Sequence, residues 1–190
     1  VGSEMCIRDR FDTTEVESFL SSSNVAASDY EASLRLYETK GTSGLSEEYT
    51  IAAYPLSQEW DEGVGKEADT PKTTDGCSWL YRKNKDGASE ISWTDAGGTH
   101  IVGDEATQAF SSESPDINMD VTTIVQKWLN GTNTNYGFLL RISGSRETST
   151  GSFEDIKFFS RQTHTIYSPK LEIKWDDHLP ATGSNTGSLT

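Results

Sequence analysis

The 190-residue chain has no apolar stretch approaching the ~18 residues that a membrane-spanning helix needs. Basic residues are also scarce. The chain has 16 lysines and arginines against 30 aspartates and glutamates, a formal net charge of −14. A surface this acidic repels phosphate backbones and anionic lipids, so we expect neither nucleic acid nor membrane among the partners. The charge either attracts cations and basic partners or keeps the protein soluble, and we favour the second interpretation.

Histidine and cysteine are rare as well. The three histidines lie far apart, outside any H-x-H or H-E-x-x-H motif, and no paired-cysteine spacing exists, so a zinc site is not predicted. The sequence also lacks the G-x-S-x-G motif of serine hydrolases and the G-x-x-x-x-G-K-[ST] phosphate-binding loop. Carboxylates are abundant, so counts alone leave a glycosidase pair open, but nothing singles one out. We therefore expect a protein that is not an enzyme.

Residues 1–10 (VGSEMCIRDR) have no hydrophobic period and do not lead into the next segment. They resemble the translation of a sequencing-library adaptor, because GTG GGC TCG GAG ATG TGT ATA AGA GAC encodes the first nine of them. Such segments are excluded from fold reasoning. On this interpretation the gene came from environmental reads, the true start lies upstream, and Cys77 is the only native cysteine, which rules out an internal disulfide. We expect deletion of residues 1–10 to leave thermal stability unchanged.

From residue 30 onward the dominant hydrophobic period is two. In 31–37 the apolar Ala32, Leu34 and Leu36 alternate with more polar residues, as in a strand with one buried face. Other candidate strands, rich in aromatic and branched residues, are 49–56, 78–82, 136–142, 156–160 and 170–175. Gly-rich polar connections lie between them at 40–46, 61–76, 95–103 and 144–152. This pattern predicts an all-β fold, an antiparallel β-sandwich of jelly-roll-like form.

One segment has helical spacing instead. Within 120–131 (DVTTIVQKWLNG) the apolar residues fall on one helix face. Asp120 can cap the first turn, and Gly131 can adopt the left-handed conformation that ends a helix. We expect one short helix around residues 121–130, lying over one end of the sandwich, with Trp128 buried in the core. Trp79 and Trp175 lie in strand patterns and are also predicted to be core residues.

Several phrases occur in an order typical of one family. They are ASLRLY (32–37), PLSQEWDEGVG (55–65), DGCSWLYR (75–82), Trp93 with GGT (97–99), DVTTIVQKWLNG (120–131), NYGFLLR (135–141), KFFSRQ (157–162) and SPKLEIKW (168–175). Together they resemble the DNRLRE-type domain, which is related to disaggregatase-type carbohydrate-binding modules. The resemblance implies one β-sandwich domain at 11–177, truncated at its N-terminus. Residues 178–190 are small and polar and show no hydrophobic period, so we expect a flexible linker that leads to a further C-terminal part.

Two departures from that family pattern stand out. The opening strands before Phe11 and Asp12 are absent, which implies truncation and one missing strand. The family's frequent glutamate after Ser160 and Arg161 is Gln162 here, which puts any role of that carboxylate in doubt. We expect Ser160 and Arg161 to form a structural hydrogen-bond cluster with neighbouring backbone.

The resemblance also implies a setting. Domains of this family sit on secreted enzymes and surface proteins and sometimes bind acidic or neutral polysaccharides. The phrase FFSRQTHTIYSPKLEIKWDD (158–177) also resembles structural proteins of marine tailed phages. We therefore expect a non-catalytic module of a phage virion, in a tail, neck or fibre-like component, that contacts surface glycans and other virion or cell-surface proteins. The alternative is a carbohydrate-binding module of a secreted bacterial polysaccharide-active or cell-surface protein.

The loop QEWDEGVG is the best candidate for glycan contact. A sugar needs an aromatic face flanked by hydrogen-bonding groups, and Trp60 with Asp61 and Glu62 supplies both. Trp93, next to a turn, is a further candidate. The alternative, which we favour, is that Trp60 buries against the sandwich edge while Glu62 caps backbone N–H groups.

The same loops offer oxygen ligands for a metal. Calcium needs about six to eight oxygens, and Asp61, Glu62 and Asp75 are the residues that would supply them. No D-x-D-x-D-G run is present, so we favour solvated loop charge over a calcium site. No other cofactor is suggested.

Overall fold

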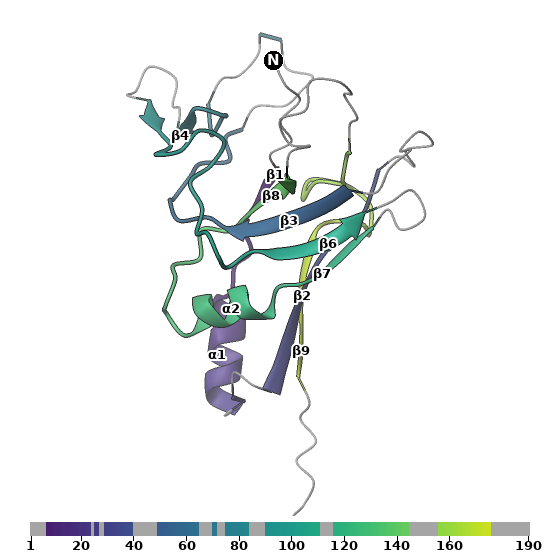
Figure 1. The fold of residues 1–190 in the computed structure, drawn as a ribbon. Helices are drawn as coiled ribbons and strands as arrows, with labels where there is room; N and C mark the ends of the chain where they lie inside the picture. Colours follow the sequence, from purple (N-terminus) through teal and green to yellow (C-terminus); the bar gives the residue numbers. More distant parts are fainter. Residues whose placement is uncertain are drawn as a thin grey trace, which may run out of the picture.

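The computed structural model describes residues 7–23, 25–26, 29–39, 49–64, 70–71, 75–83, 90–110, 116–144 and 156–175. In this part of the chain the fold is all-β and sandwich-like, with antiparallel sheets and two helices (Figure 1). The predicted fold class is therefore confirmed. No helix of these residues is long and apolar enough to cross a membrane.

Two sheets make up the body of the domain. A four-stranded sheet has the order β1-β8-β3-β6 and a three-stranded sheet the order β7-β2-β9. The strands of the first are β1 (Ile7–Asp9), β8 (Phe138–Ile142), β3 (Tyr49–Pro55) and β6 (Ala106–Phe110). Those of the second are β7 (Ile117–Asp120), β2 (Tyr30–Leu36) and β9 (Lys170–Trp175). A separate ribbon pairs β4 (Tyr81–Lys83) with β5 (Ile91–Ser92).

The inner faces of the two sheets share one apolar core. β2 contributes Ala32, Leu34 and Leu36 to it, as its alternation predicts, and β8 contributes Phe138 and Leu140. Leu139 of β8 is also fully buried but belongs to a second cluster, with Leu56 and Trp93. The four-stranded sheet is therefore covered on both faces. Its outer cover is a layer of loops, and these loops contain most of the predicted site residues.

The predicted helix is α2 (Thr122–Leu129), and it buries Ile124, Val125 and Trp128. Trp128 is 5% exposed and packs on Phe138, with 4.7 Å between ring centroids. Asp120 accepts the Thr122 N–H at 2.9 Å. The Thr122 hydroxyl, together with this N–H, lowers the pKa of the Asp120 carboxyl. Gly131 has the predicted left-handed backbone, with φ of 75°.

The prediction of a single helix was wrong. A second helix, α1 (Thr14–Ser23), buries only Leu20 fully, so its apolar stripe is too narrow to show as a clear period in the sequence. Its start is fixed by Asp12, which accepts the Thr14 N–H at 3.0 Å. The prediction of Trp175 as a core residue was also wrong, because its side chain is 41% exposed and lies against Phe19 of α1 at 4.9 Å between rings.

Strand β1 comes from the segment interpreted as an adaptor. Ile7–Asp9 pair antiparallel with Phe138–Leu140 at one edge of the four-stranded sheet. Residues 7–9 thus form part of a sheet, and the adaptor interpretation of residues 1–10 stays a prediction.

Deletion of residues 1–10 distinguishes the two interpretations. If the segment is adaptor-derived, the melting temperature measured by circular dichroism stays unchanged. If β1 belongs to the native sheet, the edge of β8 loses its backbone partner and the melting temperature falls clearly. Such a fall would refute the adaptor interpretation.

Candidate ligand-binding groove

A polar groove of about 680 Å³ opens where the connection from β1 to α1 meets the loop that follows β3. Its walls include Asp12, Glu17, Trp60, Glu62, Asn135 and Arg161. Two predicted glycan-contact residues, Trp60 and Glu62, thus lie in one groove together with Arg161, which was predicted to be structural. Asp61 and Trp93 are not among the groove residues.

Trp60 is half-buried, and the protein holds its indole in place on the side away from solvent. Its indole Nε1 donates to the Tyr136 carbonyl at 2.8 Å, and its ring packs against the Leu56–Trp93–Leu139 cluster. The expected burial of Trp60 against the sandwich is therefore right in part, because the same ring also borders the groove. A fixed, partly open indole is the arrangement that stacking against a sugar requires.

Glu62 joins the loop to a distant part of the chain. Its two carboxylate oxygens accept from the Arg161 guanidinium and the Gln162 amide, each at 2.6 Å. The expectation that Glu62 caps backbone N–H groups was wrong, as was the expectation that Arg161 bonds to nearby backbone. Of that predicted pair only Ser160 makes a local backbone bond, through its carbonyl to the Thr163 N–H at 3.1 Å. Both groups of the Glu62–Arg161 pair are largely exposed, so solvent screens the attraction.

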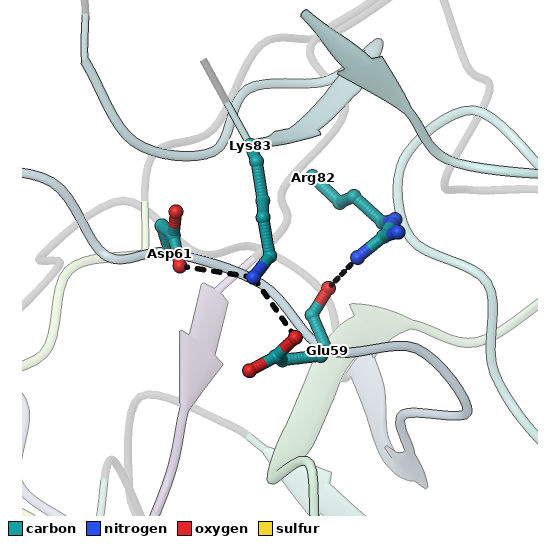
Figure 2. Close-up of polar contacts among 4 residues, drawn as sticks. All are labelled: Glu59, Asp61, Arg82 and Lys83. Carbon is teal, nitrogen blue, oxygen red and sulfur yellow. Dashed lines mark hydrogen bonds and ion pairs between the residues drawn. The ribbon is translucent and has the colours of Figure 1, made fainter. Parts of the chain in front are cut away.

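Glu59 and Asp61 point toward Lys83 of β4 (Figure 2), and neither of them lines the groove. The Lys83 ammonium lies 2.8 Å from Glu59 and 3.5 Å from Asp61, and the Arg82 guanidinium donates to the Glu59 carbonyl at 2.8 Å. The bond to Lys83 lowers the pKa of Glu59 and raises that of Lys83. Asp61 was predicted as a glycan ligand, but it helps to hold the loop instead. The alternation Glu59-Trp60-Asp61 could have predicted this, because neighbouring side chains in an extended chain face opposite sides. Trp60 and the two acids on either side of it therefore point in opposite directions.

The Glu59–Lys83 pair predicts acid sensitivity. The folded-state pKa of Glu59 lies below its ordinary value of 4.5. The stabilisation is therefore present above the ordinary value and is lost as the pH falls through the folded-state pKa. We expect the melting temperature of the wild type to decrease when the pH is lowered beyond about 4.5. The melting temperature of Glu59→Gln should decrease less over the same pH range. Parallel melting curves from pH 7 to pH 3 would contradict a role for this pair.

Two glycines allow the Trp60 loop to cross closely over the segment before β4. A Cβ on Gly63 would lie 2.7 Å from the Asp75 carbonyl oxygen, and one on Gly76 would lie 2.5 Å from that of Glu62. Both residues have positive φ, 82° and 88°. The Asp75 carboxylate accepts the Val64 N–H at 3.0 and 3.2 Å. The W-x-E-G motif at 60–63 and the D-G motif at 75–76 therefore contact each other through their backbones.

The predicted calcium ligands do not come together. Asp61 pairs with Lys83, Glu62 with Arg161, and Asp75 bonds to backbone. Within the described ranges no group of three or more His, Cys, Asp or Glu side chains could hold a metal ion. The three acids are therefore not placed as one calcium site, and each of them holds a loop in place.

Trp93 does not form an exposed platform. It is 4% exposed, and its Nε1 donates to the Ser78 carbonyl at 3.1 Å. Its predicted role in glycan contact is thus wrong, because the second cluster needs its ring as a core residue. Trp79 is half-buried over Gly97, where a Cβ would meet its ring at 2.5 Å.

The groove thus offers an indole, carboxylates, a guanidinium and an amide on loops that the protein holds in place. Such a surface suits a polar ligand with apolar patches, since rings stack on C–H groups while the polar side chains bond hydroxyls. Neither a family model, nor a curated protein, nor a solved structure matches this chain.

Proposed function

We propose that the protein is a non-catalytic module that contacts glycans through the groove between Trp60, Glu62 and Arg161. The observation that carries this proposal is the Trp60 ring, which is anchored at Nε1 yet borders a groove of about 680 Å³ with ionic and amide side chains. The carboxylate of Glu62 is engaged by Arg161 and Gln162 as a pair of fixed bonds, which suits positioning better than proton transfer.

The setting we propose is a phage virion, in a tail, neck or fibre-like component. Its support is the resemblance of 158–177 to virion structural proteins, together with the acidic chain. The alternative is a carbohydrate-binding module of a secreted bacterial protein. The two settings share the same groove and differ in their neighbouring genes, so the source contig separates them: polysaccharide-degradation genes beside this one would exclude the virion setting.

A purely structural role is the second candidate. It is favoured by the saturation of Glu62, since both of its oxygens already have partners from the chain itself. On this account the Glu62–Arg161 pair attaches the 156–175 segment to the Trp60 loop, and no ligand is needed.

Retention on immobilised polysaccharides separates the two candidates. We expect the wild type to be retained on at least one polymer of a panel of neutral and acidic polysaccharides, and Trp60→Ala and Arg161→Ala to weaken binding at least ~10-fold, as the loss of one anchoring contact would. Trp175→Ala is the matched control, because its indole is exposed and lies outside the groove. Circular dichroism confirms that each variant is folded. Retention of no polymer by the wild type would favour the structural role.

A further inference from the structure

Three aromatic rings gather beyond the end of β2, and none of them lines the groove. The Tyr167 ring lies 5.3 Å from that of Tyr37 and 5.7 Å from that of Phe159, and it is close to parallel with Phe159 at 23°. Tyr167 is 45% exposed, and the other two are half-buried. We call Tyr37, Phe159 and Tyr167 the aromatic patch. Aromatic side chains serve cores more often than surfaces, so such a cluster needs a reason.

The backbone fixes the patch in place. Tyr37 follows buried Leu36 and so points to the outer face of the three-stranded sheet. The Phe159 N–H donates to the Tyr37 carbonyl at 2.9 Å, and Glu38 forms a β-bridge with Phe158. Two segments far apart in sequence are thus paired like strands, and the rings they carry are ordered before any ligand arrives.

A lysine that has no acidic partner within the described ranges completes this surface. The Lys170 ammonium lies 5.8 Å from the centre of the Tyr37 ring, and Lys170 is paired in register with Arg35 on the same outer face. Arg35 and Lys174 both pair with Glu172, at 3.4 and 3.2 Å. Lys170 has no such carboxylate among the described residues. In a chain with 30 acidic residues against 16 basic ones, an ammonium left for an external anion is unusual.

We propose that the aromatic patch and Lys170 form a second glycan-binding surface, which takes sugars that carry carboxylate or sulfate groups. The rings would stack on the C–H faces of the sugar, and the Lys170 ammonium would bond its anionic group. This inference rests on the proposed function and extends it. Phe159 of the patch and Arg161 of the groove are two residues apart, at most ~7 Å along the chain. One polysaccharide chain can therefore contact both, and each contact strengthens the other.

Two matched pairs of probes test the charge requirement: polygalacturonate against its full methyl ester, and dextran sulfate against dextran. Affinity electrophoresis at low and high salt measures binding to each. We expect the wild type to bind the charged member of a pair at least ~10-fold more tightly than the neutral one, and to lose that preference in high salt. A preference within the polygalacturonate pair would indicate recognition of carboxylate, and a preference within the dextran pair would indicate recognition of sulfate.

Two matched pairs of variants test the surface. Lys170→Gln is expected to remove the charge preference, whereas Lys174→Gln, on the same strand face but already paired with Glu172, should keep it. Tyr167→Ala is expected to weaken binding at least ~10-fold, while Ile166→Ala, 77% exposed beside it, should not. All four positions are exposed, so the variants should fold.

The outcomes separate this inference from the proposed function. Binding that Trp60→Ala abolishes but Tyr167→Ala and Lys170→Gln leave intact would overturn the second surface and keep the groove. Equal binding of charged and neutral members would likewise overturn it. No binding of any polysaccharide by the wild type would overturn both proposals.

Discussion

Replacing Trp128 with alanine is expected to lower the free energy of unfolding by about 3–5 kcal/mol, as the loss of a large buried aromatic does. Trp128 joins α2 to the core through Phe138, and its side chain is 5% exposed. Because the ring lies between a helix and a sheet, neither neighbour can close the space without moving. For a domain of this size the melting midpoint should fall by roughly 10 °C, which thermal denaturation measures directly.

Two controls make the Trp128 prediction specific. Trp128→Phe should cost less, because the indole N–H is buried with no acceptor among the described atoms and phenylalanine removes that group along with little volume. Trp175→Ala should cost under ~1.5 kcal/mol, because that side chain is 41% exposed and lies outside the core. A loss below ~1 kcal/mol for Trp128→Ala would mean that the side chain faces water in solution.

The sequence reveals those parts of the fold in which one strand or helix face is buried. β2 alternates cleanly because it is the central strand of its sheet and one face is solvated. The α2 spacing is clear for the same reason, since Ile124, Val125 and Trp128 share one buried face. These elements could be predicted to within a residue or two from local pattern alone.

Elements held by distant partners could not be predicted in this way. β6 reads ATQAF, with weak strand propensity, and it is placed by pairing with β3 along Tyr49–Ala53. Gln108 of β6 then reaches the other sheet, where its amide accepts the Asn118 N–H at 2.8 Å and donates to the Asp116 carbonyl at 3.2 Å. A polar residue between two sheets leaves no hydrophobic signal. The strand predicted at 156–160 is only a single β-bridge at Phe158 in the structure. Here the hydrophobic signal is present, because the apolar residues of this segment cover the core, but a long partner strand is missing among the described residues.

Only part of the candidate site could be predicted from the sequence. Trp60 and Glu62 stood out because an aromatic residue and carboxylates share a Gly-rich loop. Arg161 and Gln162 were noted only through the family resemblance, and their bonds to Glu62 were not predicted. They lie about a hundred residues away from Glu62, and no local pattern indicates a long-range ion pair. The same limit explains the mistaken role of Trp93, whose burial depends on a loop layer that only the tertiary structure reveals.

Replacing Gly76 with alanine is expected to destabilise the protein by about 2–5 kcal/mol, from a left-handed backbone and an overpacked contact together. The φ of Gly76 is 88°, and a methyl group there would lie 2.5 Å from the Glu62 carbonyl oxygen and 2.7 Å from the Gly63 Cα. Both neighbours are backbone atoms, so neither can swing aside. Relief requires the Trp60 loop to separate from the segment before β4. We therefore expect the urea midpoint to fall and the proposed glycan binding to weaken.

Gly103 supplies the control that isolates the crossing. Its φ of 89° is nearly the same, but a methyl group there meets nothing within 4 Å. Gly103→Ala should therefore cost only the conformational strain, about 1–2 kcal/mol, and should leave the groove intact. The difference between the two variants measures how tightly the two loops are pressed together. If Gly76→Ala and Gly103→Ala cost the same, the two loops do not press on one another in solution, and the segment before β4 then gives the Trp60 loop no rigid support.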